Sequence, residues 1–156
     1  MSIVFKIAVV DDSEIIGSLV TKLTDEICVR TNSNHFDIDI DGTIARCAEL
    51  MRQGHYGAVI GLADGVPIAI STFTESYALY AGGKVGVIPE FYVDPSYRSA
   101  GVGAKLIAEV KRYGKSRGWS CIELCTPPLP EFDRTLAFYE ENGLKPVGGR
   151  KMREHL

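Results

Sequence analysis

The sequence has 156 residues, a length that suits one domain with its own hydrophobic core. Hydrophobic residues make up 46% of it and charged residues 24%, which is ordinary for a globular protein. The net charge of −3 argues against a nucleic-acid-binding protein, because such proteins carry a basic excess. No stretch approaches the ~18 apolar residues of a membrane span, and the N-terminus does not resemble a signal peptide. We therefore expect a soluble, cytoplasmic protein with no nucleic-acid or membrane partner.

The four cysteines show no grouping that is typical of a metal site. Cys121 and Cys125 lie four residues apart in an apolar run, and no histidine is close to them in the sequence. A zinc site needs a second pair of ligands at a set spacing. Residues 37–42 resemble the start of a calcium-binding loop, but Ala48 holds the position of the closing glutamate. The sequence therefore predicts reduced thiols in the core and no metal ion.

The pattern of apolar residues predicts one α/β domain over residues 1–156. β-branched apolar runs indicate strands, and apolar residues three or four positions apart indicate helices. In chain order, the predicted elements are a strand over 3–10, helices over 15–27 and 43–53, strands over 57–63, 66–73 and 85–93, a helix over 103–117, a strand over 119–126, a helix over 131–141 and a strand over 144–149. Asp64-Gly65 is typical of a hairpin turn. Hairpins followed by helical crossovers predict a mixed central β-sheet with helices on both faces.

The segment 98–104 joins a predicted strand to a predicted helix. Its main-chain N–H groups can point into one concavity beside the positive end of the helix, which is an arrangement that binds phosphate. Gly101 and Gly103 lack a Cβ, so phosphate oxygens can approach closely and positive φ is allowed. Arg98 can add a charge to the phosphate or brace the loop. On the two glycines alone, a simple strand-to-helix turn explains the pattern equally well.

Two motifs make the sequence resemble the GNAT superfamily of acyl-CoA-dependent N-acyltransferases. Arg98-Ser-Ala-Gly-Val-Gly103 matches the family pattern Arg/Gln-x-x-Gly-x-Gly/Ala after a strand. About forty residues on, Leu136-Ala-Phe-Tyr139-Glu-Glu-Asn-Gly-Leu144 resembles the family's Phe/Leu-Tyr-x-x-x-Gly-Phe. The resemblance covers residues 57–150. It departs from many members at Phe132 and Thr135, where those members carry Asn and Ala.

The resemblance implies that acetyl-CoA is the co-substrate and lies in a V-shaped gap between two strands. Its pantetheine arm would pair with the main chain of Tyr92 and Val93, and its diphosphate would bind the glycine-containing loop. The loop residues expected to contact the coenzyme are Arg98, Ser99, Ala100, Gly101, Val102, Gly103 and Ala104. The amine would attack the thioester directly in a ternary complex, while a main-chain N–H stabilises the developing oxyanion.

Two side chains are candidates for the proton transfers that this reaction requires. An alkylamine with a pKa of about 10.4 arrives protonated, and Glu90 is the candidate base, acting directly or through water. A strand-end carboxylate that faces solvent or pairs with a cation is the alternative for Glu90. Tyr139 is the candidate acid for the departing thiolate, because a phenol with a pKa near 10 keeps its proton at neutral pH. Packing against Phe132, Leu136 and Phe138 is the alternative for Tyr139.

The resemblance thus implies an N-acetyltransferase that acts on a primary amine of a small molecule or peptide. A protein N-terminal or lysine acetyltransferase stays open, as does a non-catalytic acyl-CoA-binding sensor. Members of the family are often dimers, which leaves both a monomer and a homodimer open. Acidic residues over 37–41, together with His35, are candidates to attract a cationic amine, and helix capping by Asp41 and plain solvation are the alternatives. The sequence does not specify the acceptor or any preference among acyl chains.

Overall fold

The computed structural model describes residues 2–34 and 38–156, so His35 and Asp37 lie outside the described residues. The chain divides into two compact units, residues 1–124 and residues 125–156, which are described separately below. A single domain over 1–156 stays a prediction. No helix in the described part of the chain is long and apolar enough to cross a membrane.

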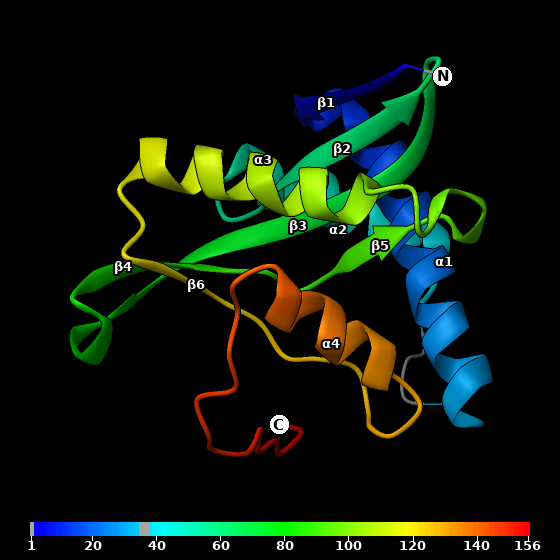
Figure 1. The fold of residues 1–156 in the computed structure, drawn as a ribbon. Coiled ribbons are helices and arrows are strands. Elements are labelled where there is room, and N and C mark those ends of the chain that lie inside the picture. Colours follow the sequence, from blue (N-terminus) through cyan, green and yellow to red (C-terminus); the bar gives the residue numbers. More distant parts are fainter. Residues whose placement is uncertain (1, 35–37) are drawn as a thin grey trace. The chain divides into compact units, whose positions relative to one another are not determined.

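The first unit contains a six-stranded mixed sheet with three long helices (Figure 1). Its elements are β1 (Ile3–Ile7), α1 (Ser13–Thr31), α2 (Ile40–Arg52), β2 (Gly57–Ala63), β3 (Val66–Ala78), β4 (Gly83–Val87), β5 (Phe91–Val93), α3 (Val102–Arg117) and β6 (Cys121–Glu123), with short 3₁₀ turns at Val10–Asp12, Leu79–Ala81 and Pro95–Tyr97. The strand order is β1-β2-β3-β4-β6, and β5 pairs with β3. Within residues 2–34 and 38–156, only β4 and β6 pair in parallel. The predicted mixed sheet is confirmed.

Helices cover both faces of this sheet, as predicted. On one face, Leu106 and Val110 of α3 are buried in a cluster that includes Val59 of β2. On the other face, Ile16 of α1 packs in a cluster that includes the adjacent β2 residue, Ile60. Neighbouring residues of a strand point to opposite faces, so one apolar strand supplies both cores. This explains why β2 has a continuous apolar sequence instead of an alternating one.

The predicted continuous strand over 85–93 is wrong, because the chain forms two strands there. β4 pairs with β3 up to Val87↔Thr74, and β5 resumes the pairing at Phe91↔Ser71. Three residues, 88–90, therefore lie opposite the two residues 72 and 73 of β3. Such an extra residue is a β-bulge, which interrupts the ladder and turns side chains in new directions. Pro89 lies within the bulge and has no N–H to donate to a ladder.

Several predicted boundaries in the first unit differ from the observed ones. β1 ends at Ile7 instead of residue 10, and β6 covers only Cys121–Glu123 of the predicted 119–126. α2 begins three residues earlier than predicted, because the Asp39 carboxylate accepts a hydrogen bond of 2.8 Å from the Gly42 N–H and so caps the helix. The polar composition of the segment before residue 43 favours a loop, which is why the sequence pattern places the helix start too late. The thiol of Cys47 is buried, whereas Cys121 is exposed, contrary to the prediction of core thiols.

The second unit contains one helix, α4 (Asp133–Glu141). It ends where predicted, with Asn142 as its C-cap and Gly143 at a φ of 95°. The strand predicted over 144–149 is wrong, since residues 144–156 have no regular secondary structure. Cys125 is exposed in this unit, again contrary to a core thiol.

The indole of Trp119, just beyond α3, fills the space between α3 and the sheet. Its ring packs edge-on against Phe73 and Tyr113, with centroids 5.5 Å and 5.7 Å away. A Cβ added at Gly114 of α3 or at Gly86 of β4 would collide with this indole. Both positions therefore need glycine for space, although glycine within a helix is unfavourable.

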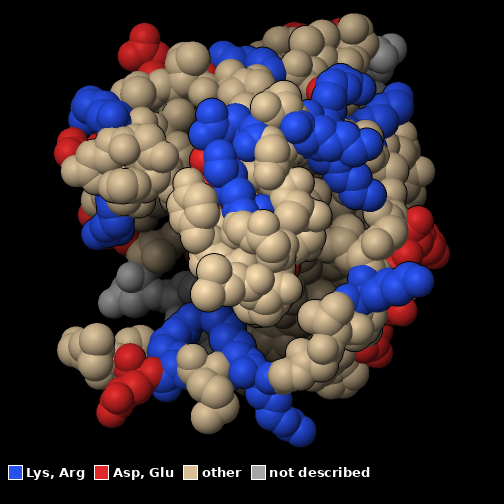
Figure 2. All heavy atoms as spheres, turned by 90° about the vertical axis from the view of Figure 1, so that its left-hand side faces the viewer, with Lys and Arg blue, Asp and Glu red and all other residues tan. Residues whose placement is uncertain are grey.

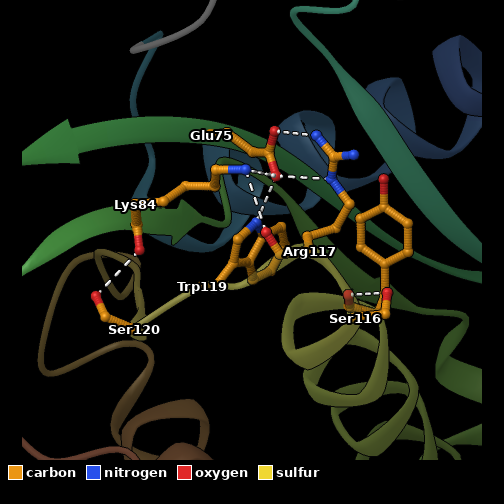
Figure 3. Close-up of polar contacts among 7 residues, drawn as sticks. Glu75, Lys84, Ser116, Arg117, Trp119 and Ser120 are labelled. Atoms are coloured by element: carbon orange, nitrogen blue, oxygen red, sulfur yellow. Dashed lines mark hydrogen bonds and ion pairs between the residues drawn. The ribbon is translucent and has the colours of Figure 1, made fainter.

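Three side chains meet at the Glu75 carboxylate and join the end of α3 to the sheet (Figure 3). Arg117 donates two hydrogen bonds to it, of 3.0 Å and 2.8 Å, and the Trp119 indole donates one of 2.6 Å. The Lys84 ammonium lies 4.0 Å from the same carboxylate and donates to the Arg117 carbonyl at 3.1 Å. The hydrogen bonds from Arg117 and then Trp119 outweigh partial burial and lower the pKa of Glu75 to about 2.

We expect Gly114→Ala to destabilise the protein by about 1–3 kcal/mol, because its Cβ overpacks against Trp119. The same substitution at an open helix position stabilises by about 1 kcal/mol. Urea unfolding at pH 7 measures the change in the free energy of unfolding. In a Trp119→Ala background the effect of Gly114→Ala should change sign. Stabilisation in the wild-type background would contradict the proposed packing.

We expect the stability that Glu75 contributes to depend on pH. Its pKa is lowered from 4.5 to about 2, so its contribution is present above pH 4.5 and is lost as the pH falls towards 2. Glu75→Gln should lower the free energy of unfolding by about 1 kcal/mol at pH 7 and by progressively less below pH 4.5. Urea unfolding at several pH values checks this. Glu49→Gln, which alters an exposed ion pair with Arg52, serves as the control and should have little effect at any pH.

Candidate active site

The loop over residues 98–104 leads from β5 into α3 with unbonded main-chain donors at the start of the helix. Gly101 is the N-cap of α3, and no side chain caps the helix. Lys105 donates its N–H to the Gly101 carbonyl at 3.2 Å, which is the first bond of the helical ladder. The preceding N–H groups have no partner within the helix. This is the arrangement that phosphate binding needs, and the binding itself stays a prediction.

The two glycines of the loop serve different purposes. Gly101 has a φ of 79°, a conformation that other residues adopt at a cost. Gly103 lies inside α3 and is not among the residues with positive φ. The expected positive φ thus occurs at Gly101, and Gly103 contributes only its missing Cβ. Ser99 also has a positive φ, of 67°, which the sequence did not indicate.

Arg98 braces the loop through contacts with two other elements. Its Nε donates to the Val93 carbonyl of β5 at 2.8 Å. Its two terminal nitrogens donate to the carboxylate of Glu26, in α1, at 3.0 Å and 2.6 Å. The guanidinium also lies 5.7 Å from the centroid of the Tyr92 ring. Of the two roles that the sequence left open for Arg98, the structure supports bracing.

Strands β4 and β6 part immediately after the bulge begins. Their last link is the hydrogen bond of 3.0 Å from the Ile88 N–H to the Glu123 carbonyl. Beyond it, β5 pairs only with β3 among the described residues. The resemblance implies a V-shaped gap for the pantetheine arm between two strands, and its location at this parting stays a prediction.

One edge of β5 pairs with β3, and the register of this pairing decides which main-chain groups of β5 point to the opposite edge. The Thr72 N–H donates to the Glu90 carbonyl at 3.0 Å, and the Asp94 N–H donates to the Ile68 carbonyl at 2.8 Å. Because main-chain groups alternate along a strand, those of Tyr92 also point to β3, opposite Ile70. The groups of Phe91 and Val93 point to the opposite edge. The main-chain groups of Val93 point away from β3, which is the direction that its predicted contact with the pantetheine arm requires. The main-chain groups of Tyr92 point toward β3 instead.

Glu90 lies at the end of the bulge, and two hydroxyl groups hold its carboxylate. Thr72 donates to Oε1 at 2.5 Å and accepts a bond of 3.0 Å from the Glu90 N–H. The Tyr56 hydroxyl donates to the same Oε1. Neither expected alternative, a cation partner or a freely solvated carboxylate, describes this arrangement among the described residues. The bulge and the two hydroxyls together fix the direction of the carboxylate.

Tyr56 is a site residue that sequence reasoning missed. Burial, followed by the negative charge of Glu90, raises the pKa of its hydroxyl, so Tyr56 stays a neutral donor. It stands one residue before β2, outside both family motifs. Its contact with Glu90 spans 34 residues of sequence, and no local pattern signals such a contact.

Tyr139 lies in α4 of the second unit, which is described by itself. Its side chain is buried, and its ring packs against Phe138 with centroids 5.4 Å apart. Burial raises the pKa of its hydroxyl, so Tyr139 keeps its proton at neutral pH. These observations are compatible with a proton donor and also with the packing role that the sequence left open.

A cavity of about 410 Å³ lies at the end of α3 away from the loop. Tyr113 and Arg117 from the last turns of α3 line it, together with Tyr56 and Glu75. Arg117 and Glu75 are bonded to each other, so the charges of this cavity are already satisfied. α3 has 16 residues and is therefore about 24 Å long, which separates the cavity from the loop.

Basic residues gather where α3 ends, on the face that Figure 2 shows. They are Lys111, Arg112, Lys115 and Arg117. Arg112 pairs with Glu109 at 2.7 Å, and Arg117 pairs with Glu75 at 2.8 Å. Positive charge in this position complements the negative end of the helix dipole. The cluster thus has a structural explanation.

Among the described residues, no group of three or more His, Cys, Asp or Glu side chains is placed to hold a metal ion. The donors at the start of α3 suit an anionic group instead.

Comparison with known proteins supports the interpretation of the loop. Residues 21–144 match the sequence model of the acetyltransferase (GNAT) family. The chain is 31% identical over 94 residues to aminoglycoside N(6')-acetyltransferase type 1 of Salmonella typhimurium, covering 58% of this chain and 63% of that protein. It is 38% identical over 64 residues to glucosamine 6-phosphate N-acetyltransferase of Trypanosoma brucei brucei, covering 41% and 40% of the two chains. The chain thus spans less than two thirds of the curated relatives it matches.

Solved structures share the fold over nearly the whole chain. The aminoglycoside N-acetyltransferase AAC(6')-Iy in complex with CoA superposes with a TM-score of 0.80 at 21% identity, covering 99% of this chain and 95% of that one. Ribosomal-protein-alanine N-acetyltransferase from Brucella melitensis biovar Abortus 2308 gives 0.75 at 18% identity, covering 99% and 100%. The family match extends over 124 of 156 residues and includes the loop at the start of α3. The chain therefore belongs to the GNAT family of acetyltransferases.

Proposed function

We propose that the protein transfers an acetyl group from acetyl-CoA to a primary amine of a small molecule. The observation that carries this proposal is the arrangement at the end of β5. β4 parts from β6 at Ile88, just before β5, and a few residues after β5 the chain reaches the start of α3 with its unbonded N–H groups. Membership of the GNAT family supplies the activity that this arrangement serves. The CoA complex of a protein with the same fold supports the choice of coenzyme.

The main chain provides the coenzyme contacts in this proposal. The N–H groups of residues 99–104 bind the diphosphate beside the positive end of α3. The outward-facing main chain of Phe91 and the N–H of Val93 lie along the pantetheine arm, whereas the Val93 carbonyl already accepts a hydrogen bond from Nε of Arg98. An N–H of this strand stabilises the oxyanion that forms from the thioester carbonyl.

The chemistry is a direct attack with two proton transfers. Glu90 takes the proton of the ammonium group, directly or through water, and the free amine attacks the carbonyl carbon. The new C–N bond forms, the C–S bond breaks, and the nitrogen releases its second proton to water. Tyr139 donates its proton to the departing thiolate and regains one from solvent. The hydroxyls of Thr72 and Tyr56 bond to Oε1 of Glu90, and in this proposal Oε2 takes the proton.

The relatives support a small-molecule acceptor. Two of them are named for amino sugars or aminoglycosides, which are small molecules with primary amines. The net charge of −3 also favours a cationic acceptor. A protein α-amino group is the second candidate, because the structural neighbour from Brucella melitensis acts on ribosomal-protein alanine, as its name states.

Thiol release from acetyl-CoA tests the proposal. The panel of acceptors comprises an aminoglycoside, glucosamine 6-phosphate and a peptide with an N-terminal alanine. We expect release above background with at least one of the first two. Release with the peptide alone would favour the second candidate. Binding of CoA without release from any acceptor would indicate a non-catalytic sensor and contradict the proposal.

We expect Tyr139→Phe to lower kcat by about 100-fold and to leave the KM for acetyl-CoA nearly unchanged. The substitution removes the donated proton and keeps the buried ring. Steady-state kinetics with the best acceptor measure both constants. Tyr77→Phe, at an exposed position of β3, is the control and should match the wild type. An unchanged kcat in Tyr139→Phe would show that this tyrosine has only a packing role.

We expect Glu90→Gln to lower kcat/KM by about 100-fold at pH 7, because Gln cannot accept the proton of the ammonium group. The amide oxygen can still accept from Thr72 and Tyr56, so the fold should be retained. The rate of the variant should recover as the pH rises towards the acceptor's pKa of about 10, where the amine is already free. Glu109→Gln, on the surface of α3, is the control. A loss that does not depend on pH would contradict a role as base.

A further inference from the structure

Arg98, the first residue of the family motif, forms a two-point ion pair with a residue far away in the sequence. Glu26 precedes it by 72 positions, in α1, and the two nitrogen–oxygen distances are 3.0 Å and 2.6 Å. Two parallel hydrogen bonds of this kind fix the plane of the guanidinium as well as its position. The loop before α3 is therefore tied to a helix on the opposite face of the sheet.

The pair is placed where it controls the shape of the loop. Arg98 immediately precedes Ser99, whose φ of 67° is unfavourable for a residue with a Cβ. Its Nε donates to the Val93 carbonyl at 2.8 Å, which closes the short turn over residues 94–97. Glu26 can thus hold the residue from which the positive-φ segment begins. Helix α1, which carries Glu26, is anchored by the buried side chain of the next residue, Ile27.

The charges of the pair are matched to each other. Partial burial would raise the pKa of Glu26, but the hydrogen bonds and charge of Arg98, followed by those of Arg30, bring it below its usual value. Glu26 is therefore ionised at neutral pH and neutralises the guanidinium. An arginine engaged in this way leaves the anionic diphosphate to the main-chain N–H groups of the loop.

We propose that Glu26 is a positioning residue of the coenzyme site. By holding the Arg98 guanidinium it fixes the loop, so that the N–H groups of residues 99–104 are already arranged to bind the diphosphate. This inference rests on the proposed function. Arg98 then supports the loop and is not itself a phosphate ligand for which Glu26 competes.

The two roles of Arg98 predict opposite effects of Glu26→Gln on affinity. If Glu26 positions Arg98, the dissociation constant for CoA rises about three- to tenfold in Glu26→Gln, because the loop of the variant must be ordered on binding. If Arg98 were a phosphate ligand held back by Glu26, its release would tighten binding. Isothermal titration calorimetry with CoA measures the constant. Asp25→Asn, an exposed neighbour in α1 with the same change of charge, is the matched control and should bind as the wild type does.

A truncated donor separates this role from a general loss of structure. S-acetylpantetheine lacks the diphosphate, so its turnover by Glu26→Gln should equal that of the wild type. With acetyl-CoA, KM should rise while kcat stays nearly constant. Equal losses with both donors would show that Glu26 acts on the fold as a whole and would overturn the inference.

A double-mutant cycle tests the link between the two residues. Once Arg98→Ala has removed the guanidinium that Glu26 binds, adding Glu26→Gln should weaken CoA binding no further. Additive effects would mean that Glu26 acts through another group and would contradict the inference. A wild-type protein that does not bind CoA would instead refute the proposed function. Normal wild-type binding with no change in Glu26→Gln would refute only the role of Glu26.

Discussion

The extra residue at the junction of β4 and β5 is the feature on which the rest of the site depends. Without it, β4 and β5 would form one strand with a regular ladder to β3, and side chains would alternate without interruption. With it, pairing between β4 and β6 ends at Ile88. The same bulge brings the Glu90 carboxylate to the hydroxyls of Thr72 and Tyr56. One irregularity thus separates two strands and places an acidic group beside the separation.

Helix α3 is held at both of its ends by an arginine paired with a glutamate from another element. At the start, Arg98 binds Glu26 of α1, and at the end Arg117 binds Glu75 of β3. Between these pairs, Leu106 and Val110 are buried against the sheet. Apolar packing supplies most of the stabilisation, and the two pairs set where the helix starts and ends relative to the strands. A helix held in this way presents its N-terminal N–H groups at a defined place without a capping side chain.

Most of the fold could be predicted from local patterns, and the differences have identifiable causes. β2 was predicted residue for residue because its apolar run is bounded by turn residues. The strand over 85–93 was predicted as continuous because its composition is apolar throughout, whereas the break comes from bonds between Glu90 and Thr72. The strand over 144–149 was predicted from composition alone, but a strand exists only where a neighbour pairs with it. The start of α2 was missed because the capping residue Asp39 stands in a polar segment.

By itself, the sequence determined the family, the mixed sheet with helices on both faces, and the loop with glycines at 101 and 103. These follow from local patterns in the sequence: apolar runs for strands, apolar residues three or four positions apart for helices, turn residues between them, and two motifs in a set order. Only the tertiary structure decided that Arg98 is bound to Glu26, that Tyr56 bonds to Glu90, and that Tyr92 directs its main chain to β3. Each of these contacts joins residues far apart in the chain or depends on the register between strands. Local propensity carries no information about such contacts, because they form only when separate elements pack together.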